Sequence, residues 1–269
     1  LYAWCRKCDD IADGQDHGGT MRGVADGQAR LSTLRVLTDA ALRGEPTGDP
    51  AFDGFGVVMR ECAIPHRYAH DLLEGFALDA RDWRPRSEAD MLRYCYHVAG
   101  AVGCMMAVLM GVDPEDEATL DRACDLGIAF QLANIARDIA EDDAAGRCYL
   151  PDDWLAMLDI GPGEHMKPHN RKKLALMGRW LADEAEQYEA SARVGAKHLP
   201  LRARWAVLSA AGIYGEIARK VRASGAQAWD QRIFTSRPEK FRWVRRAFID
   251  AIANNPRDMQ RDALWTRKR

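Results

Sequence analysis

The sequence predicts an all-α protein that folds as a single helical bundle over residues 1–269. Apolar residues recur mostly at intervals of three and four, which is the spacing of one helix face. Alternating runs rich in β-branched residues, which would predict strands, are scarce. Several of the periodic segments are also long. Long amphipathic helices bury their apolar faces against one another, so we expect a bundle.

In the first half of the chain, loops are expected over residues 14–27 and over residues 44–56, the latter rich in Gly, Pro and Asp. A helix is then expected to start after Ser87, because Ser87-x-x-Asp90 resembles a capping box. It runs through apolar sequence to about residue 110, where Gly111 supplies a stop signal.

In the second half, Asp113-Pro114 predicts the N-cap and first-turn proline of a helix that ends near residue 143. A loop is expected over residues 146–168. Two further helices are predicted over residues 171 to about 197 and 201 to about 224, separated by Leu199-Pro200.

The composition excludes several classes of protein. The 38 Lys and Arg nearly balance the 40 Asp and Glu, so no global basic field is available for a nucleic-acid partner. The longest apolar run, residues 98–112, is shorter than the roughly 18 residues that span a bilayer. Seven cysteines, an odd number in a long chain, argue against a disulfide scaffold. We therefore expect a cytoplasmic protein that is soluble or at most peripheral to the inner face of the membrane.

Acidic residues gather near the start of the chain. Each helical residue advances about 100°, so Tyr2, Arg6, Asp9 and Asp13 fall within an arc of roughly 60°. One narrow stripe would thus carry an aromatic hydroxyl, a cation and two carboxylates.

A second stripe is predicted on the helix that ends near residue 143. Gln131, Asn134, Asp138 and Asp142 fall within an arc of roughly 80° on that helix. Carboxylate and amide oxygens are hard ligands that suit Mg²⁺ or Mn²⁺, and Mg²⁺ commonly bridges carboxylates to phosphates. A single stripe of this kind is usually a solvated helix face. Two such stripes within apolar sequence favour a site that binds metal ions and a diphosphate.

Three segments together resemble the squalene and phytoene synthase family. The resemblance is closest to bacterial phytoene synthases, and it runs from residue 1 to about residue 241. The segments are Tyr2-Ala3-Trp4-Cys5-Arg6-Lys7-Cys8-Asp9-Asp10-Ile11-Ala12-Asp13, Tyr94-Cys95-Tyr96-His97-Val98-Ala99-Gly100-Ala101-Val102-Gly103, and Gln131-Leu132-Ala133-Asn134-Ile135-Ala136-Arg137-Asp138-Ile139-Ala140-Glu141-Asp142, the last followed by Gly146-Arg147-Cys148-Tyr149-Leu150-Pro151.

The resemblance implies an isoprenoid synthase fold with a central apolar cavity. It also implies head-to-head condensation of two geranylgeranyl diphosphates, through a cyclopropyl intermediate, to 15-cis-phytoene in carotenoid biosynthesis. By the same resemblance, the Mg²⁺ or Mn²⁺ ligands would be Asp9, Asp13, Asp138 and Asp142, with Asn134 and Gln131 assisting. Diphosphate oxygens would be contacted by Arg6, Tyr214 and Arg232. The hydrocarbon cavity would be lined by Tyr94, Val98, Val102 and Gly103, with Tyr2 as a further substrate contact.

Two departures from the family pattern stand out. The family carries a further helix ahead of the first motif, so we expect such a helix to be missing before Leu1. In the middle signature, His97 stands where squalene synthases carry a tyrosine, which argues against a squalene-type proton transfer at this position.

Two alternatives stay open at this point. One is a squalene or dehydrosqualene synthase that uses farnesyl diphosphate, and the other is a non-catalytic assembly protein of the same fold. The basic, aromatic segment at residues 237–246 predicts a solvated helix face, with transient contact to an anionic membrane as the alternative. The oligomeric state is not predicted.

Overall fold

A computed structural model describes residues 1–13 and 27–268 of the chain, and these residues form helices and loops without a strand. The predicted all-α class is therefore confirmed. The α-helices are α1 (Tyr2–Asp13), α2 (Gly27–Arg43), α3 (Pro50–Glu61), α4 (Arg67–Asp79), α5 (Glu88–Cys95), α6 (Ala101–Leu109), α7 (Glu117–Ala144), α8 (Asp152–Met157), α9 (Arg171–Gly195), α10 (Leu201–Ser224) and α11 (Arg237–Ala253).

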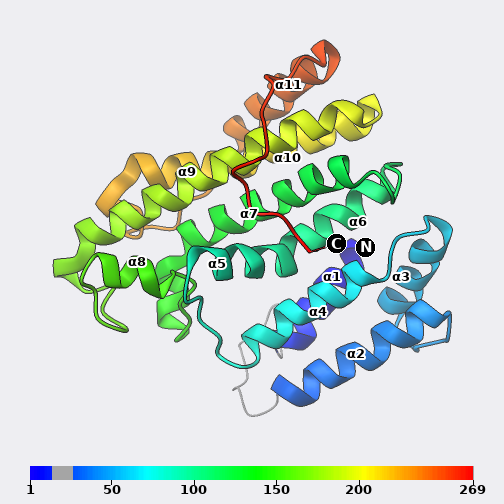
Figure 1. Ribbon diagram of the computed structural model, residues 1–269, viewed down its shortest axis with the longest axis horizontal. Helices are drawn as coiled ribbons and strands as arrows, with labels where there is room; N and C mark the ends of the chain where they lie inside the picture. Colours follow the sequence, from blue (N-terminus) through cyan, green and yellow to red (C-terminus); the bar gives the residue numbers. More distant parts are fainter. Residues whose placement is uncertain (14–26, 269) are drawn as a thin grey trace.

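The long helix α7 lies at the centre of the bundle, where it packs against α6, α9 and α10. Helix α11 covers the far side of α10, and the N-terminal helices α1 to α4 gather on the opposite side of the molecule (Figure 1). One hydrophobic cluster extends through these layers from Trp4 to Leu264. The arrangement leaves the inner faces of α1, α4, α6 and α7 next to one another.

The predicted helix after Ser87 is present as α5 and α6, joined by a π-helical turn, Tyr96–Gly100. The Ser87 hydroxyl accepts from the backbone N–H of Asp90, which is one half of a capping box; the Asp90 carboxylate accepts from the backbone N–H of Arg86 rather than from that of Ser87. In length and hydropathy, Glu88–Leu109 could cross a membrane, but more than half of it is buried inside the bundle. It is therefore a core helix of this fold.

The close packing of α6 on α7 depends on glycine. A Cβ at Gly127 would lie 2.2 Å from the carbonyl oxygen of Ala99, and one at Gly103 would lie 2.4 Å from that of Ala123. Neither glycine has a positive φ, so these positions need the missing side chain rather than backbone freedom. The two helices therefore approach more closely than ordinary side chains allow.

Two predicted boundaries are wrong. Asp113 does not cap α7; its carboxylate instead accepts from Glu115 N–H in a turn, and Asp116 caps the helix through Thr119 N–H at 3.1 Å. The predicted loop over residues 44–56 already contains the start of α3, which Asp49 caps through Ala51 N–H at 2.8 Å.

Glycine within residues 44–56 favoured a loop in the sequence, but in the structure it serves helix packing. Gly56 lies inside α3, where a Cβ would come 2.3 Å from the carbonyl oxygen of Ala41 on α2. The predicted loop over residues 146–168 likewise contains the short helix α8. The loop predicted over residues 14–27 lies outside the described residues except for Gly27, which begins α2.

Candidate active site

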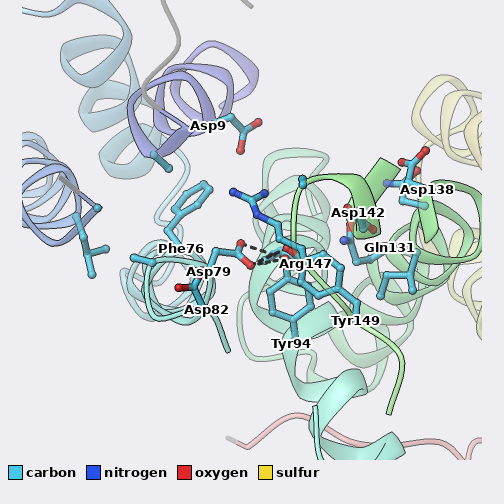
Figure 2. A pocket seen from close by; sticks show the side chains of 18 of the residues that line it. Asp9, Phe76, Asp79, Asp82, Tyr94, Gln131, Asp138, Asp142, Arg147 and Tyr149 are labelled. Atoms are coloured by element: carbon cyan, nitrogen blue, oxygen red, sulfur yellow. Dashed lines mark hydrogen bonds between the residues drawn. The ribbon is translucent and has the colours of Figure 1, made fainter. Parts of the chain in front are cut away.

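A polar cavity of about 560 Å³ opens between α1, α2, α4 and α7. Figure 2 shows Asp138 and Asp142 on the α7 side of this cavity and Asp79 and Asp82 on the α4 side, with Arg147 between them. The acidic residues that line it are Asp9, Asp79, Asp82, Asp138 and Asp142, and the basic ones are Arg30 and Arg147.

The second predicted stripe faces this cavity as a whole. Gln131, Asn134, Asp138 and Asp142 all line it, because a helix returns to the same face every three to four residues. Helix α7 is held by packing on α6, α9 and α10, so the direction of this face is fixed by the core.

Two cations bracket Asp138. Arg137 Nε donates to Asp138 Oδ1 at 2.7 Å, and Arg232 Nη2 lies 3.2 Å from the same oxygen. Arg232 also lies 3.9 Å from Glu141. The structure therefore places Arg232, a predicted diphosphate contact, beside the predicted metal ligand Asp138, although Arg232 is not among the described residues that line the polar cavity.

Asp142 carries an unusual carboxyl group. Burial, followed by the negative charge of Asp138, raises the pKa of Asp142 to about 7, against the lowering effect of Arg147. A bound cation would stabilise the ionised carboxylate and so oppose the effects of burial and of Asp138. The donor set of carboxylate and amide oxygens therefore fits Mg²⁺ or Mn²⁺ chemically.

The described residues contain no group of three His, Cys, Asp or Glu side chains close enough to hold a metal by themselves. Mg²⁺ commonly binds through one or two carboxylates, keeps several waters and takes other oxygens from substrate phosphates. We therefore expect protein carboxylates to supply only part of each coordination shell.

The orientation of α1 about its own axis turns only part of the first predicted stripe toward the polar cavity. Trp4 and Cys8 are fully buried, and the Trp4 ring stacks on Phe55 at 3.9 Å, which fixes how the helix is turned. The polar cavity then meets the side of α1 that carries Asp9 and Ala12.

Two other residues of this stripe lie further round the helix. Tyr2 is 82% exposed, and Arg6 pairs with Asp10 at 3.0 Å. Neither is among the residues that line the polar cavity in the described part of the chain. Asp13 is the last residue of α1, and its side chain lies outside the described part of the structure. Of the three described side chains of the stripe, that of Asp9 lines the cavity.

An apolar cavity of about 530 Å³ adjoins the polar one and runs between α6, α7, α10 and the end of α9. Its lining includes Val98, Val102 and Gly103, as the resemblance implied, and also Tyr214. Tyr214, expected at the diphosphate, instead stacks on Phe130 with ring centroids 4.3 Å apart. The two cavities share Asp9, Val98, Gln131 and Asn134, so a polar compartment opens directly into an apolar one.

Tyr94 was expected in the hydrocarbon cavity, but it lines the polar one. Its hydroxyl donates to the Asp79 carboxylate at 3.1 Å, and the Tyr149 hydroxyl donates to the same group at 2.9 Å. The two rings stack at 4.9 Å. Burial and the adjacent Asp79 carboxylate raise the pKa of both phenols, so both hydroxyls keep their protons and hold Asp79 in place.

Sequence reasoning missed several residues of the polar cavity: Arg30, Asp79, Asp82, Arg147 and Tyr149. Arg147 and Tyr149 lie within residues 146–151, which contribute to the sequence prediction only through their resemblance to the family. Asp79 did carry a signal, because it ends the apolar run Phe76-Ala77-Leu78, where a carboxylate needs partners. His97 lines neither cavity in the described part of the chain; its Nδ1 lies 2.9 Å from the carbonyl oxygen of Asp71.

Comparisons of sequence agree on one family. The sequence model of the squalene/phytoene synthase family matches residues 1–239. A phytoene synthase from Pseudescherichia vulneris is 47% identical, with 99% of this chain and 87% of that protein aligned. A 15-cis-phytoene synthase from Pantoea ananas is 48% identical, with 96% of this chain and 83% of that protein aligned.

Solved structures show the same architecture. A dehydrosqualene synthase in complex with a ligand superposes with a TM-score of 0.82 at 27% identity, over 94% of this chain and 85% of that one. A squalene synthase from Alicyclobacillus acidocaldarius gives a TM-score of 0.70 at 24% identity, over 83% of this chain and 81% of that one, and so supports the fold.

Proposed function

The chain belongs to the squalene/phytoene synthase family, and we propose that it is a 15-cis-phytoene synthase that joins two molecules of geranylgeranyl diphosphate. The observation that carries this proposal is the junction of the two cavities at Asp9, Val98, Gln131 and Asn134. A prenyl diphosphate has one highly charged end and one long apolar tail, and the junction offers a matching compartment to each.

The polar cavity is suited to diphosphate departure. Asp9, Asp138 and Asp142, assisted by Asn134, would hold Mg²⁺ or Mn²⁺, and Asp13 remains a further predicted ligand. When bound, these ions would neutralise the charge that develops on the leaving diphosphate. Arg30 and Arg147 line the same cavity and add positive charge for the diphosphate oxygens.

The apolar cavity is suited to the carbon skeleton. When the C1–O bond of one substrate breaks, the diphosphate leaves with the electron pair, and an allylic cation remains. The walls of this cavity, formed mostly by apolar side chains such as Val102 and Phe130, keep water from that cation. The double bond of the second substrate can then attack it.

The family reaction proceeds in two stages. Attack by the second double bond, with loss of a proton, closes a cyclopropane ring and leaves a C40 diphosphate. Its C–O bond then breaks, the carbon skeleton rearranges, and loss of a second proton gives the C40 hydrocarbon. The products are therefore one hydrocarbon, two diphosphates and two protons.

A direct assay tests the proposal. With geranylgeranyl diphosphate and Mg²⁺, we expect a C40 hydrocarbon detected by chromatography and mass spectrometry, and Asp138→Asn should lower kcat/KM roughly 100- to 1000-fold. Asp153→Asn is the matched control, because Asp153 is exposed on α8 and lines neither cavity. A wild-type protein that yields no C40 product would refute the proposal.

The farnesyl-using alternative is separated by competition. With both diphosphates present in equal amounts, we expect C40 product to exceed C30 product, and the reverse ratio would favour a squalene or dehydrosqualene synthase. A non-catalytic assembly protein would form neither product and would have no need of the α7 stripe.

We also propose that the outer face of α11 touches an anionic membrane surface during catalysis. Phe241 and Ile252 lie three turns apart on this face and are 72% and 59% exposed, with Phe248 and Ile249 between them. A groove beside it is lined by Arg193, Arg219, Arg242, Arg245 and Arg246 together with Glu189 and Asp250, and all of these arginines except Arg245 form ion pairs with carboxylates that the structure describes. Exposed apolar side chains with flanking cations are the composition of helices that lie in a membrane interface.

Vesicle flotation tests the membrane contact. The protein should float with vesicles rich in phosphatidylglycerol, stay unbound with pure phosphatidylcholine, and lose binding in high salt. The double variant Phe241→Ser and Ile252→Ser should bind more weakly while it keeps its C40 activity in detergent. Equal flotation with both vesicle types, or none with either, would contradict this role for α11.

A further inference from the structure

The apolar cavity extends from its junction with the polar cavity toward three buried lining residues, the furthest along α6, α7 and the α9–α10 connection, which we call its end wall. Val112 follows α6, Thr119 lies in the first turn of α7, and Leu199 precedes α10; they are 8%, 5% and 6% exposed. We propose that this end wall sets the longest prenyl chain that the cavity accepts, and thereby selects geranylgeranyl over farnesyl diphosphate. The inference rests on the proposed function, because it concerns the same substrate site.

The depth of the apolar cavity can be estimated along α7. Its lining residues recur every three or four positions from Asn134, at the junction with the polar cavity, to Thr119 at the wall. With a rise of about 1.5 Å per residue, Thr119 lies about 18 Å along the helix axis from Gln131 and about 22 Å from Asn134. Both amides belong to the polar junction, so the apolar chain has roughly this length available.

This depth matches one of the two candidate substrates. With C–C bonds of about 1.5 Å, the sixteen-carbon main chain of a geranylgeranyl group extends about 19 Å, whereas the twelve-carbon chain of a farnesyl group extends about 14 Å. A geranylgeranyl tail that starts at the junction therefore reaches the end wall. A farnesyl tail stops about 5 Å short and leaves apolar surface without contacts, which costs binding energy.

The side walls restrict length less than the end wall does. Small residues keep the cavity open along its course: Gly103, Ala123, Gly127, Gly195, Ala206 and Ala210. The α6 and α7 backbones cannot move closer, because Gly103 of α6 already lies against the carbonyl of Ala123 of α7. The end wall is thus the place where added volume shortens the cavity without narrowing it near the reacting carbons.

Two filling variants test the proposal. Val112→Phe and Thr119→Phe should each lower kcat/KM for geranylgeranyl diphosphate at least tenfold relative to farnesyl diphosphate, since hydrophobic pockets discriminate one methylene by roughly 10- to 200-fold. The matched control is Leu109→Phe, which adds the same ring at a partly exposed position of α6 that does not line the cavity. Its substrate ratio should stay within about twofold of wild type.

A third variant moves the wall in the opposite direction. Leu199→Ala removes side-chain volume at the wall and should raise the use of geranylfarnesyl diphosphate, which has one more isoprene unit. Circular dichroism and thermal unfolding would establish that each variant is folded. Val112→Phe lies outside a helix, so it keeps the test available if Thr119→Phe destabilises the start of α7.

The outcomes separate this inference from the proposed function. If wild type forms no hydrocarbon from either diphosphate, the proposed function fails. The end wall can still be tested by calorimetry, which measures how geranylgeranyl and farnesyl thiolodiphosphate, both non-hydrolysable, bind to wild type and to Val112→Phe. A shift of preference toward the farnesyl analogue supports the inference. Folded filling variants with an unchanged ratio, in turnover or in binding, would overturn it.

Discussion

The carboxyl of Asp142 makes the polar cavity sensitive to pH. Its pKa is raised to about 7 because the group is buried beside Asp138, whereas in an unfolded chain it would ionise near 3.8. Between these two values the unfolded chain binds fewer protons than the folded one, so stability falls as pH rises from about 4 to about 7. Above pH 7 the destabilising contribution is fully present.

Asp142→Asn should therefore stabilise the protein in the presence of a chelator. At pH 8 we expect a gain of about 1–2 kcal/mol, which allows for solvent screening of this partly exposed carboxyl. The gain should shrink as pH falls toward 5. Chemical denaturation at both pH values measures it, with Asp153→Asn as the exposed control. A variant no more stable than wild type at pH 8 would contradict the burial argument, and added Mg²⁺ should reverse the order by favouring the ionised wild-type group.

Individual helices differ in how well sequence predicts them. The α5–α6 segment and α10 were predicted within a residue of their bounds, because local signals decide both: the Ser87 cap at one, and Pro200 directly before the other. The predicted start of α7 is too early. Asp113 and Asp116 both suit an N-cap, and the sequence alone does not indicate that Asp116 caps the helix while Asp113 only stabilises the preceding turn.

The elements that sequence missed depend on tertiary contacts. Glycine normally marks a turn, yet Gly54 and Gly56 lie inside α3, and Gly56 is required by the carbonyl of Ala41 on another helix. The π-helical turn at Tyr96–Gly100 likewise has no local signature in the sequence. Both features arise where two backbones approach, which a single-helix pattern does not report.

Tertiary contacts also explain why the α7 stripe was predicted correctly and the α1 stripe only in part. All four stripe residues of α7 line the polar cavity, because their shared face follows from helical periodicity alone. On α1 the periodicity was applied in the same way, but the packing of Trp4 turns the helix so that Asp9 faces the cavity and Tyr2 faces solvent. Periodicity predicts which residues share a face, whereas the direction of that face is set by the core.

At the scale of the whole molecule, residues 257–268 return from α11 across the bundle and reach the start of α7 (Figure 1). Arg261 Nη2 donates to Asp125 at 2.8 Å. Arg267, almost fully buried, lies over the Tyr68 ring, pairs with Glu117, and lies 3.0 Å from Asp121. This segment joins the beginning of α7 to α4.

Arg267→Met should destabilise the whole protein. Removing one partner leaves the buried Asp121 carboxylate with less compensation, and the expected loss is about 3 kcal/mol or more. Lys268→Met, at the exposed neighbouring residue, should change stability by less than about 0.5 kcal/mol. Urea denaturation of both variants measures the difference, and equal midpoints would show that the ion pairs of Arg267 contribute little.

The pairing of Arg267 with Glu117 also constrains the timing of folding in the cell. The two residues are 150 positions apart. At a synthesis rate of roughly 5–20 residues per second, the ribosome needs about 8–30 s to add the residues between them. During that interval Asp121 and Asp125 lack Arg267 and Arg261, whereas Glu117 already has Arg67 as a partner, with 3.1 Å between Arg67 Nη2 and Glu117 Oε1. We therefore expect this corner of the nascent chain to be the last to resist protease and the first to recruit chaperones.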